Sequence, residues 1–364
     1  MKKHKFYFLD IHVSDFIFTP FSYFIIGKRP LLKYQYLSRI KFSGIINSTL
    51  SSSLPAKLRI LFPSFPLRLF SVIEFFLWKK INRLKTPKVN INNLDSDDII
   101  FMFAYKNIDQ SLQYLVDINF NGKVIVHLSH IHTFIIDKIF FDLLNIELCF
   151  DNDISFHPYF IKKYPFYKKN ILIVPFSLNN KFFNHIRIKS SQKHILTICG
   201  TFHKFPIGTF DIEFDGFSTL HPLRLALANY DKFSINVNNR LSLYHSNSIL
   251  SVIIGQKKYF NFDIVKEYQD SSYALIPGEG NGAIAIGSIE AMACGCTVLL
   301  SSWEIKSLNL NTSIADYIEY QDFNHLISII SNLKSNFYIS FKNIKFASRY
   351  RSEILLEDFN DIFK

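Results

Sequence analysis

The sequence predicts an α/β protein of two domains, each organised around a parallel β-sheet. The chain has 364 residues, which is too long for one ordinary core and suits two domains of roughly 150–200 residues each. Apolar strand-like runs alternate with helical spacing in both halves, and a polar, basic stretch at 184–193 separates them. We therefore expect an N-terminal domain at 1–187, a C-terminal domain at 188–345 and a final helical segment at 346–364.

The first half reads as a series of buried strands joined by a helix. Apolar runs at 6–9, 99–104 and 122–128 each suit a strand, and apolar residues recur at helical spacing over 107–119. Strand, helix and strand in this order form the unit from which parallel sheets are built. A further strand is expected at 145–150.

The second half repeats the alternation after the expected linker. An apolar run at 194–201 ends in Gly200-Thr201 and opens the new domain. The pattern then predicts strands and helices in turn. The expected strands are 249–254, 272–276 and 297–300, and the expected helices are 262–269 and 284–294.

Composition and charge narrow the classes of partner. Hydrophobic residues make up 48% and charged residues 20%, which is typical of a folded protein. The net charge of +11 and the pI of about 9.3 favour anionic partners. The basic residues are scattered, with their densest cluster at 79–85, and no nucleic-acid-binding motif accompanies them. We therefore expect a phosphate-bearing or membrane partner and no nucleic acid.

Two features bear on location. No stretch reaches the ~18 uninterrupted apolar residues of a spanning helix, but the segment 59–78 places apolar and aromatic residues beside the basic cluster. It suits either an interfacial segment on an anionic membrane or a buried core helix. Four cysteines, at positions 149, 199, 294 and 296, lack zinc-site spacing and are expected to be free and buried. Together these features favour a cytoplasmic protein, with peripheral membrane contact as an option.

The most informative segment is 271–304. An apolar strand there ends at Pro277, a glycine-rich loop with one carboxylate follows, and a helix then begins. Glycines allow the backbone to approach a ligand closely. The N–H groups and partial positive charge of a helix N-terminus suit a diphosphate. In an open α/β sheet, ligands bind at such carboxyl ends of strands.

This segment resembles the donor-binding region of GT-B glycosyltransferases. The run from Glu290 to Gly295 resembles glycosyltransferase family 4, and the longer frame from Ser271 to Trp303 resembles the exostosin-like family. The passages 171–183 and 195–204 are similar to the end of the N-terminal domain and the start of the donor domain in family 4. The resemblance implies two Rossmann-like domains facing across a cleft, with 346–364 packing back on the first.

The resemblance also implies roles for particular residues. Glu290 would hold the ribose hydroxyls of the nucleotide, and Glu279 would face the donor sugar. The backbone at Gly200 and Thr201 would approach the phosphates. The remaining donor-binding candidates are Lys204, which would neutralise the leaving diphosphate, and Gly280, Asn281, Gly282 and Ser288 of the loop and helix. The alternatives are that Glu290 only caps its helix or pairs with a lysine, and that Lys204 is a solvated surface residue.

A catalytic base is needed only if the enzyme inverts the configuration of the sugar. The candidates are Asp10 and His12 after the first strand, and His127, His130 and His132 at a later one. They occupy strand-end positions from which a base can reach a hydroxyl. No cofactor and no metal is expected, because the nucleotide-sugar is itself a co-substrate and the histidines lack a third nearby ligand.

The resemblance therefore implies transfer of a sugar from a nucleotide-sugar to a hydroxyl of a glycan acceptor, perhaps lipid-linked, in bacterial surface polysaccharide synthesis. Two alternatives remain. The wider spacing of Glu279 and Glu290 than in family 4, and Gly278-Glu279 where exostosin-like proteins carry an arginine, suit a degenerate GT-B fold acting as a scaffold. Asp151 and Asp153 imitate the metal motif of a GT-A glycosyltransferase.

Overall fold

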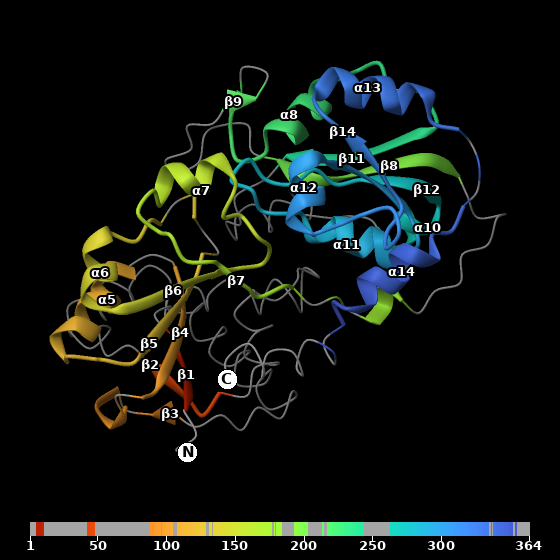
Figure 1. Cartoon of the computed structure of the whole chain (residues 1–364). Helices are drawn as coiled ribbons and strands as arrows, with labels where there is room; N and C mark the ends of the chain where they lie inside the picture. Colours follow the sequence, from red (N-terminus) through yellow and green to blue (C-terminus); the bar gives the residue numbers. More distant parts are fainter. Residues whose placement is uncertain are drawn as a thin grey trace, which may run out of the picture. The chain divides into compact units, whose positions relative to one another are not determined.

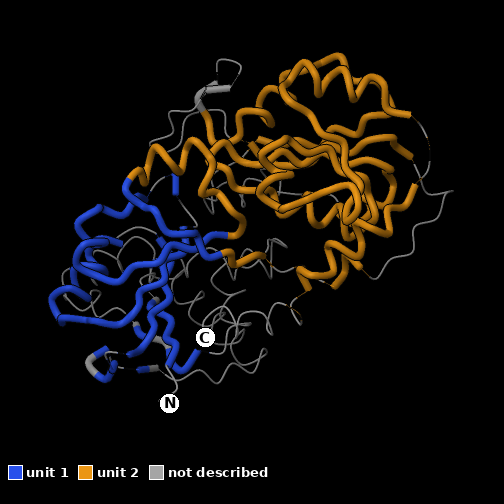
Figure 2. The backbone as a smooth tube through the Cα atoms, in the orientation of Figure 1, with its two compact units in different colours: residues 1–150, 166–172 blue, residues 151–165, 173–364 orange. Residues whose placement is uncertain are grey.

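The structure, a computed structural model, forms two compact units, which are described separately (Figure 2). Unit 1 comprises residues 1–150 and 166–172, and unit 2 comprises residues 151–165 and 173–364. The residues whose structure is described are 5–10, 42–47, 88–89, 91–95, 97–104, 108–128, 131–132, 134–176, 178, 180–183, 193–202, 213–214, 217–243, 263–334, 336, 338–351 and 354.

Unit 1 is built on a seven-stranded sheet in the order β3-β2-β1-β4-β5-β6-β7. Every adjacent pair from β3 to β6 is parallel. The strands are β1 (Phe6–Asp10), β2 (Gly44–Asn47), β3 (Lys88–Val89), β4 (Ile99–Phe103), β5 (Lys123–His127), β6 (Asn145–Phe150) and β7 (Leu172–Ile173). Helix α5 (Ile108–Asp117) connects β4 to β5, and α6 (Lys138–Leu143) precedes β6 (Figure 1). Parallel neighbours require such crossovers, which explains the alternation in the sequence.

Aromatic side chains fill much of the core of unit 1. Phe6 stacks on Phe42 with ring centroids 4.9 Å apart, and Phe101 meets Phe103 edge to face at 5.4 Å. Phe8 contacts the same group. Offset and edge-to-face pairs of this kind add to the stabilisation from burial alone. Several of the 39 phenylalanines of the chain therefore pack against the first sheet.

Unit 2 carries a five-stranded sheet in the order β11-β8-β12-β13-β14, parallel throughout. Its strands are β8 (His194–Phe202), β11 (Val237–Leu243), β12 (Ser271–Leu275), β13 (Thr297–Ser301) and β14 (Tyr317–Tyr320). Central strands of a parallel sheet are buried on both faces and read as continuous apolar runs. β12 and β13 fit this rule, since almost all of their residues are buried.

Helices cover both faces of this sheet (Figure 1). On one face, α10 (Ile264–Gln269), α11 (Ile286–Ala293) and α14 (Phe341–Ser348) enclose a cluster that includes Tyr268 and Met292. On the other, α8 (Pro222–Asn229) and α13 (Phe323–Asn332) pack Leu227 and Leu326 against the sheet. A further helix, α12 (Ser302–Ser307), follows β13 directly, and a small antiparallel pair, β9 (Glu213–Phe214) and β10 (Phe217–Ser218), precedes α8.

The segment 151–165 belongs to unit 2 although it lies in sequence between two strands of unit 1. It contains the short helix α7 (Pro158–Lys163). Pro158 suits the first turn, where its missing N–H costs nothing, and the His157 side chain accepts the Tyr159 N–H at 3.3 Å. This assignment differs from a simple division of the chain near residue 187, and the boundary expected there stays a prediction.

Most strands and helices expected from the pattern are present. β1, β4, β5, β6, β8, β12 and β13 lie where apolar runs predict them, and α5, α10 and α11 lie where helical spacing does. The segments 59–78, 79–85, 184–192 and 249–254 fall outside the described residues. In the described part of 346–364, α14 packs on α11 within unit 2, and the rest of that expectation stays a prediction.

Some elements were not predicted from the sequence. The clearest case is β11, and its polar sequence explains why. β11 reads Val-Asn-Asn-Arg-Leu-Ser-Leu and lies at the edge of its sheet, where β8 is its one partner among the described strands. Its residues are exposed or half-buried. An edge strand has one solvated side and needs no continuous apolar run, so hydrophobic periodicity does not reveal it.

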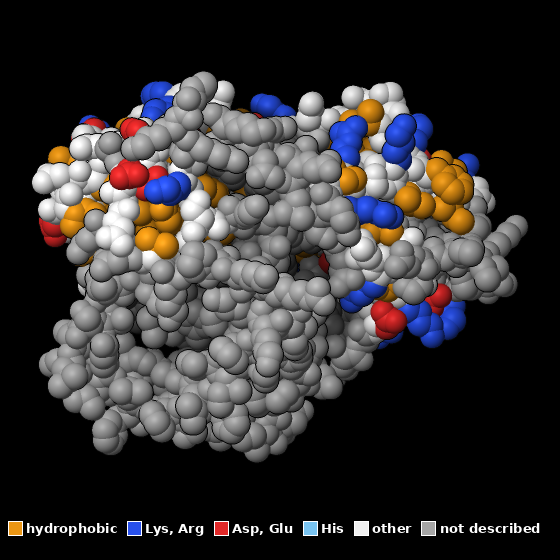
Figure 3. All heavy atoms as spheres, turned by 90° about the horizontal axis from the view of Figure 1, so that it is seen from below, with side chains coloured by type: hydrophobic (Ala, Val, Ile, Leu, Met, Phe, Trp, Pro, Cys, Tyr) orange, Lys and Arg blue, Asp and Glu red, His pale blue; other side chains and the backbone are white. Residues whose placement is uncertain are grey.

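All four cysteines are buried, as predicted, and none of them forms a disulfide. Cys294 and Cys296 flank Gly295, whose φ of +80° ends α11 in the left-handed conformation typical of a helix C-terminus. Within the described part of the chain, no helix combines the length and apolar character needed to cross a membrane. On the face seen in Figure 3, the described Lys and Arg side chains lie scattered among apolar and acidic ones.

Candidate functional site

The loop from Ile276 to Ala285 connects β12 to α11 at the carboxyl edge of the second sheet. Its own backbone closes it: Glu279 N donates to Ala283 O at 2.7 Å, and Gly282 N donates to Glu279 O at 3.0 Å. Asn281 braces it further, since its Oδ1 accepts the Ala283 N–H at 2.9 Å and its Nδ2 donates to a Glu279 carboxylate oxygen at 3.1 Å. The sequence-predicted residues Glu279, Gly280, Asn281 and Gly282 therefore form one structured loop.

Two glycines of this loop are required by packing within the protein. A Cβ at Gly278 would lie 2.6 Å from Trp303 Cη2, and one at Gly282 would lie 2.8 Å from His157 Cγ. Gly282 also has a φ of +93°, which side-chain-bearing residues rarely adopt. The close approach predicted for these glycines is thus made by Trp303 and His157, two side chains that the sequence reasoning had not placed here.

Helix α11 begins directly after the loop and presents an uncapped N-terminus. Its N-cap residue is Ala285, which makes no side-chain hydrogen bond to the first turn. The first N–H groups of a helix lack intrahelical acceptors, and they attract anions. Ser288 does not serve as a cap, because its Oγ donates to Ile276 O at 3.0 Å. Ser288 instead ties the first turn of α11 to the end of β12.

A buried carboxylate anchors Gly278, near the start of the loop. Glu304 of α12 is 0% exposed, and its Oε1 accepts the Gly278 N–H at 3.1 Å. Its Oε2 accepts from Ser301 N and Ser301 Oγ, both at 2.8 Å, and from the Tyr320 hydroxyl at 3.3 Å. Burial raises the pKa of the Glu304 carboxyl, and the hydrogen bonds that it accepts oppose that rise.

A buried arginine joins the ends of the two central strands. Arg224 of α8 is 7% exposed, and its Nε donates to Pro277 O at 2.7 Å while Nη1 donates to Thr201 O at 2.9 Å. Gly200, with a φ of +146°, lies against the same side chain, since a Cβ there would come within 3.1 Å of Arg224 Cδ. Arg224 therefore places a permanent positive charge between the end of β8, where Gly200 and Thr201 are predicted to approach the phosphates, and the glycine-rich loop. Sequence reasoning missed it because its carbonyl partners are remote in sequence.

The start of α8 also meets the glycine-rich loop. Gly280 N donates to Leu220 O at 2.9 Å, and His221 Nε2 lies 3.6 Å from a Glu279 carboxylate oxygen. His221 is 4% exposed, whereas the Glu279 side chain keeps 30% of its surface exposed. Glu279 is thus held by Asn281 and His221 while part of its carboxylate remains accessible.

The remaining donor-site candidates are Thr201, Glu290 and Lys204. Thr201 lies one residue before the end of β8 and is 8% exposed. Glu290 lies on α11 and is 2% exposed, so protein atoms enclose its carboxylate. Its predicted contact with a ribose stays a prediction. Lys204 falls outside the described residues.

The candidate bases belong to the first part of the chain. Asp10 ends β1 in unit 1, in register with Asn47. His127 is fully buried in β5, 5.1 Å from the Phe103 ring, which suits a core side chain. His132 is described, whereas His12 and His130 are not. The catalytic roles assigned to Asp10, His12 and His130 stay predictions.

Asp151 and Asp153 follow β6, as expected, but Asp153 stabilises a turn. Its Oδ1 accepts from Ser155 N at 2.9 Å and Ser155 Oγ at 2.6 Å. No group of three or more His, Cys, Asp or Glu side chains arranged to hold a metal ion occurs among the residues that the structure describes.

Comparison with known proteins identifies the fold. No protein-family model matches the sequence, and no curated protein matches it. Among solved structures, HepE from Anabaena in complex with UDP and glucose is similar with a TM-score of 0.51 and 11% identity, over 99% of both chains. Sucrose-phosphate synthase from Thermosynechococcus elongatus gives a TM-score of 0.49 at 10% identity, over 99% of this chain and 98% of that one. A glycosyltransferase from Rickettsia africae gives 0.47 at 11% identity, over 100% and 98%.

At such low identity the likeness to HepE establishes the fold alone. Both chains align over nearly their whole length, and two parallel α/β units are what the GT-B architecture requires. The GT-A alternative, which relied on Asp151 and Asp153, is therefore wrong as a description of the fold. The chain has the GT-B fold, with two Rossmann-like units, as the resemblance in its sequence implied.

Proposed function

We propose that this protein is a glycosyltransferase that binds a nucleotide-sugar in unit 2 and transfers the sugar to a hydroxyl of a glycan acceptor. The observation that carries the proposal is the uncapped N-terminus of α11 at the glycine-rich loop, with the buried Arg224 guanidinium at the same strand ends. Backbone N–H groups and a fixed cation suit a diphosphate and stabilise the charge that develops as it leaves.

The nature of the donor is suggested by a protein of the same fold. HepE has been crystallised with UDP, with UDP and glucose, and with UDP-glucose. A uridine nucleotide is therefore the first donor to test here. Glu279 is the carboxylate that we propose contacts the sugar, and its contacts with Asn281 and His221 together with its partly exposed side chain support this role.

The acceptor and the setting extend the proposal. We infer a glycan or lipid-linked glycan acceptor in bacterial surface polysaccharide synthesis, supported by the resemblance of 271–304 to family 4 and exostosin-like sequences. Asp10, His12 and His130 are the bases to test if the enzyme inverts. The net charge of +11 favours peripheral contact with an anionic membrane from the cytoplasmic side. No metal is assigned a role, because Arg224 supplies positive charge at the proposed phosphate site.

The proposal is tested by thermal unfolding and turnover with UDP, GDP, CMP, ADP and dTDP and their common sugar conjugates. A ligand at 100 times its dissociation constant stabilises the folded state by about 2.7 kcal/mol, which gives a clear rise in Tm. One nucleotide should raise the Tm of the wild type, its sugar conjugate should be turned over, and Glu290→Gln should reduce both effects. Glu319→Gln, on the exposed surface of β14, is the matched control.

A binding or scaffold role is the alternative, and it is favoured by Gly278-Glu279 in the place of the arginine of exostosin-like sequences and by the wide spacing of Glu279 and Glu290. The two functions differ in the assay above. Binding of a nucleotide without any turnover across the conjugates and glycan acceptors would support the scaffold. The absence of any Tm shift would contradict both the donor site and the glycosyltransferase function.

A further inference from the structure

The segment 151–165 has a place in unit 2 that the proposed function does not explain. Ser307 Oγ of α12 donates to Asp153 O at 2.6 Å, and Lys306 Nζ lies 4.1 Å from the centre of the Phe156 ring. His157 fills the space beside Gly282 and meets the Trp303 ring edge to face at 5.5 Å. This short piece of chain therefore packs directly on the glycine-rich loop and on α12.

Asn152 makes the most specific of these contacts. Its Nδ2 donates to Gly282 O at 3.0 Å and to Ser307 Oγ at 2.7 Å, and its Oδ1 accepts the Ile284 N–H at 3.2 Å. The residue is 3% exposed. One amide thus holds a carbonyl and an N–H from either side of Ala283, just before α11 begins at Ile286.

Only an amide satisfies this site. Gly282 O needs a donor, and Ser307 Oγ needs one too because its own proton is directed to Asp153 O. Ile284 N–H needs an acceptor. A carboxylate offers no donor, and an aliphatic side chain offers neither, so either replacement leaves buried polar groups of the loop unsatisfied.

The histidine that packs beside Gly282 is neutral at physiological pH. Burial lowers the pKa of the nearby His157 imidazole to about 4, and its Nδ1 accepts the Tyr159 N–H. The ring is therefore uncharged and serves as packing for Gly282. The geometry of the loop at this end depends on Asn152 and His157 together, with no ion pair between them.

We propose that Asn152 is a positioning residue for donor binding: it sets the conformation of the glycine-rich loop and, through it, the direction of the first N–H groups of α11. This inference rests on the proposed function for the identity of the ligand. It does not rest on that function for the effect of Asn152 on the loop, which can be measured without a ligand.

The test compares Asn152→Leu with Asn343→Leu. Asn343 is a matched control, because it is fully buried in the same unit and its amide also makes three hydrogen bonds, to Cys296 O, Asp316 O and Asp316 N, none of them to the loop. Ser307→Ala is the milder third variant, since it removes one partner of Asn152 and keeps the Asn152 amide. For each protein, three quantities are measured: the Tm, hydrogen exchange in peptides covering 278–286, and the Kd for UDP or the nucleotide found in the panel.

We expect both leucine variants to lower the Tm. Only Asn152→Leu should accelerate exchange at 278–286 and raise the Kd about tenfold or more, and Ser307→Ala should have the same effects to a smaller degree. Unchanged exchange in Asn152→Leu and Ser307→Ala, or equal changes at 278–286 in Asn343→Leu, would overturn the proposal. If the wild type binds no nucleotide, the proposed function fails, and the exchange comparison still decides whether Asn152 holds the loop. If Asn152→Leu does not fold, Ser307→Ala decides it.

Discussion

The Glu304 carboxylate accepts the backbone N–H of Gly278 at 3.1 Å, although 26 residues separate them in sequence. The same carboxylate accepts from Ser301 in the capping box that begins α12. One buried side chain therefore fixes both the start of the glycine-rich loop and the helix that carries Trp303 and Ser307. The stability of the loop is coupled to that of α12 through a single acidic group.

Replacing Glu304 should reveal this coupling through pH. Burial raises its pKa in the folded state, so over the range between the ordinary glutamate pKa and this raised value the folded protein binds more protons than the unfolded chain. Stability should fall as pH rises through that range. Glu304→Gln removes the titration, so the difference in Tm between wild type and variant should vary with pH there, as measured by thermal unfolding.

The matched control for this experiment is Glu319→Gln, which changes an exposed carboxylate in the same unit. Measured over the same pH range, this variant shows what removing an exposed carboxylate of unit 2 does to the Tm. Glu304→Ala should be more damaging than Glu304→Gln, by about 2 kcal/mol or more, because it leaves several buried donors without an acceptor. A Glu304→Gln difference that does not vary with pH would contradict this account.

Gly282 should tolerate no side chain, for two separable reasons. Its φ of +93° strains any L-residue, and His157 occupies the position of a Cβ. Gly282→Ala should lose about 1–3 kcal/mol of folding free energy, measured by denaturant unfolding. The double variant Gly282→Ala/His157→Ala should recover part of the steric cost and none of the conformational cost. If the double variant loses as much stability as the sum of the two single losses, or more, His157 is not the source of the clash.

Much of the scaffold could be predicted from the sequence, and the reason is physical. β12 and β13 are buried on both faces, so each is encoded by a continuous apolar run that predicts a strand. Helix α11 follows a proline and a glycine-rich loop, and these residues predict where it begins. The loop residues from Glu279 to Gly282 were predicted to form a site for the same reason, and their ligand stays a prediction. Each of these signals is local, and local patterns survive in a single sequence.

The supporting side chains could not be predicted, because their roles depend on remote partners. Asn152 reaches Gly282 across 130 residues, and Arg224 reaches Pro277 across 53. Nothing in the pattern around either residue indicates those contacts. Even the glycines were interpreted incompletely, since the need for Gly278 and Gly282 comes from Trp303 and His157. Tertiary contacts thus determine how the loop is held, while local sequence determines where it lies.

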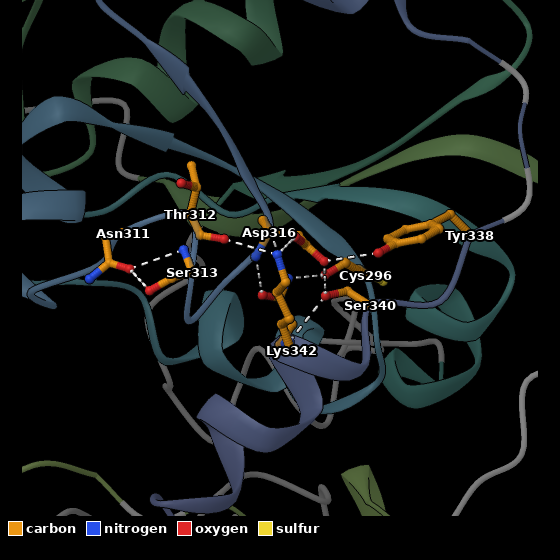
Figure 4. A network of polar contacts seen from close by, with 9 residues as sticks. Cys296, Asn311, Thr312, Ser313, Asp316, Tyr338, Ser340 and Lys342 are labelled. Carbon is orange, nitrogen blue, oxygen red and sulfur yellow. Dashed lines mark hydrogen bonds and ion pairs between the residues drawn. The ribbon is translucent and has the colours of Figure 1, made fainter.

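A second group of polar contacts, around Asp316, attaches α14 and the segment before it to the rest of unit 2 (Figure 4). Asp316 Oδ2 accepts from Ser340 Oγ at 2.7 Å and Tyr338 OH at 3.1 Å, and Oδ1 lies 3.3 Å from Lys342 Nζ. Burial acts to raise the Asp316 pKa, but hydrogen bonds from Ser340, Tyr338 and Lys342 outweigh it and lower the pKa overall. Its charged form is therefore favoured by folding.

Stability should accordingly decline in acid. The stabilisation from Asp316 is complete above the ordinary aspartate pKa and is lost as pH falls through the lower folded-state pKa. Asp316→Asn removes this titration, so the wild type should exceed it in Tm at neutral pH and the difference should shrink toward pH 2–3. The change should be about 1 kcal/mol, because the site is partly open to solvent. A difference that grows in acid would reverse the assigned sign.

Arg224 provides the most direct link between the fold and the proposed donor. Arg224→Met keeps a similar aliphatic stem but leaves Thr201 O and Pro277 O without their guanidinium donors and removes the positive charge at the strand ends. We expect the Kd for the nucleoside diphosphate to rise at least tenfold, or about 1.4 kcal/mol, in isothermal titration. Arg224→Lys should restore the charge without the two fixed hydrogen bonds and should recover only part of the affinity. The matched control is Arg240→Met, which removes the exposed arginine of the edge strand that pairs with Glu267 of α10, and it should bind as the wild type does. If the two methionine variants bind nucleotide equally well, the charge of Arg224 serves only to join β8 and β12, and the phosphates are held by the backbone of the loop and α11.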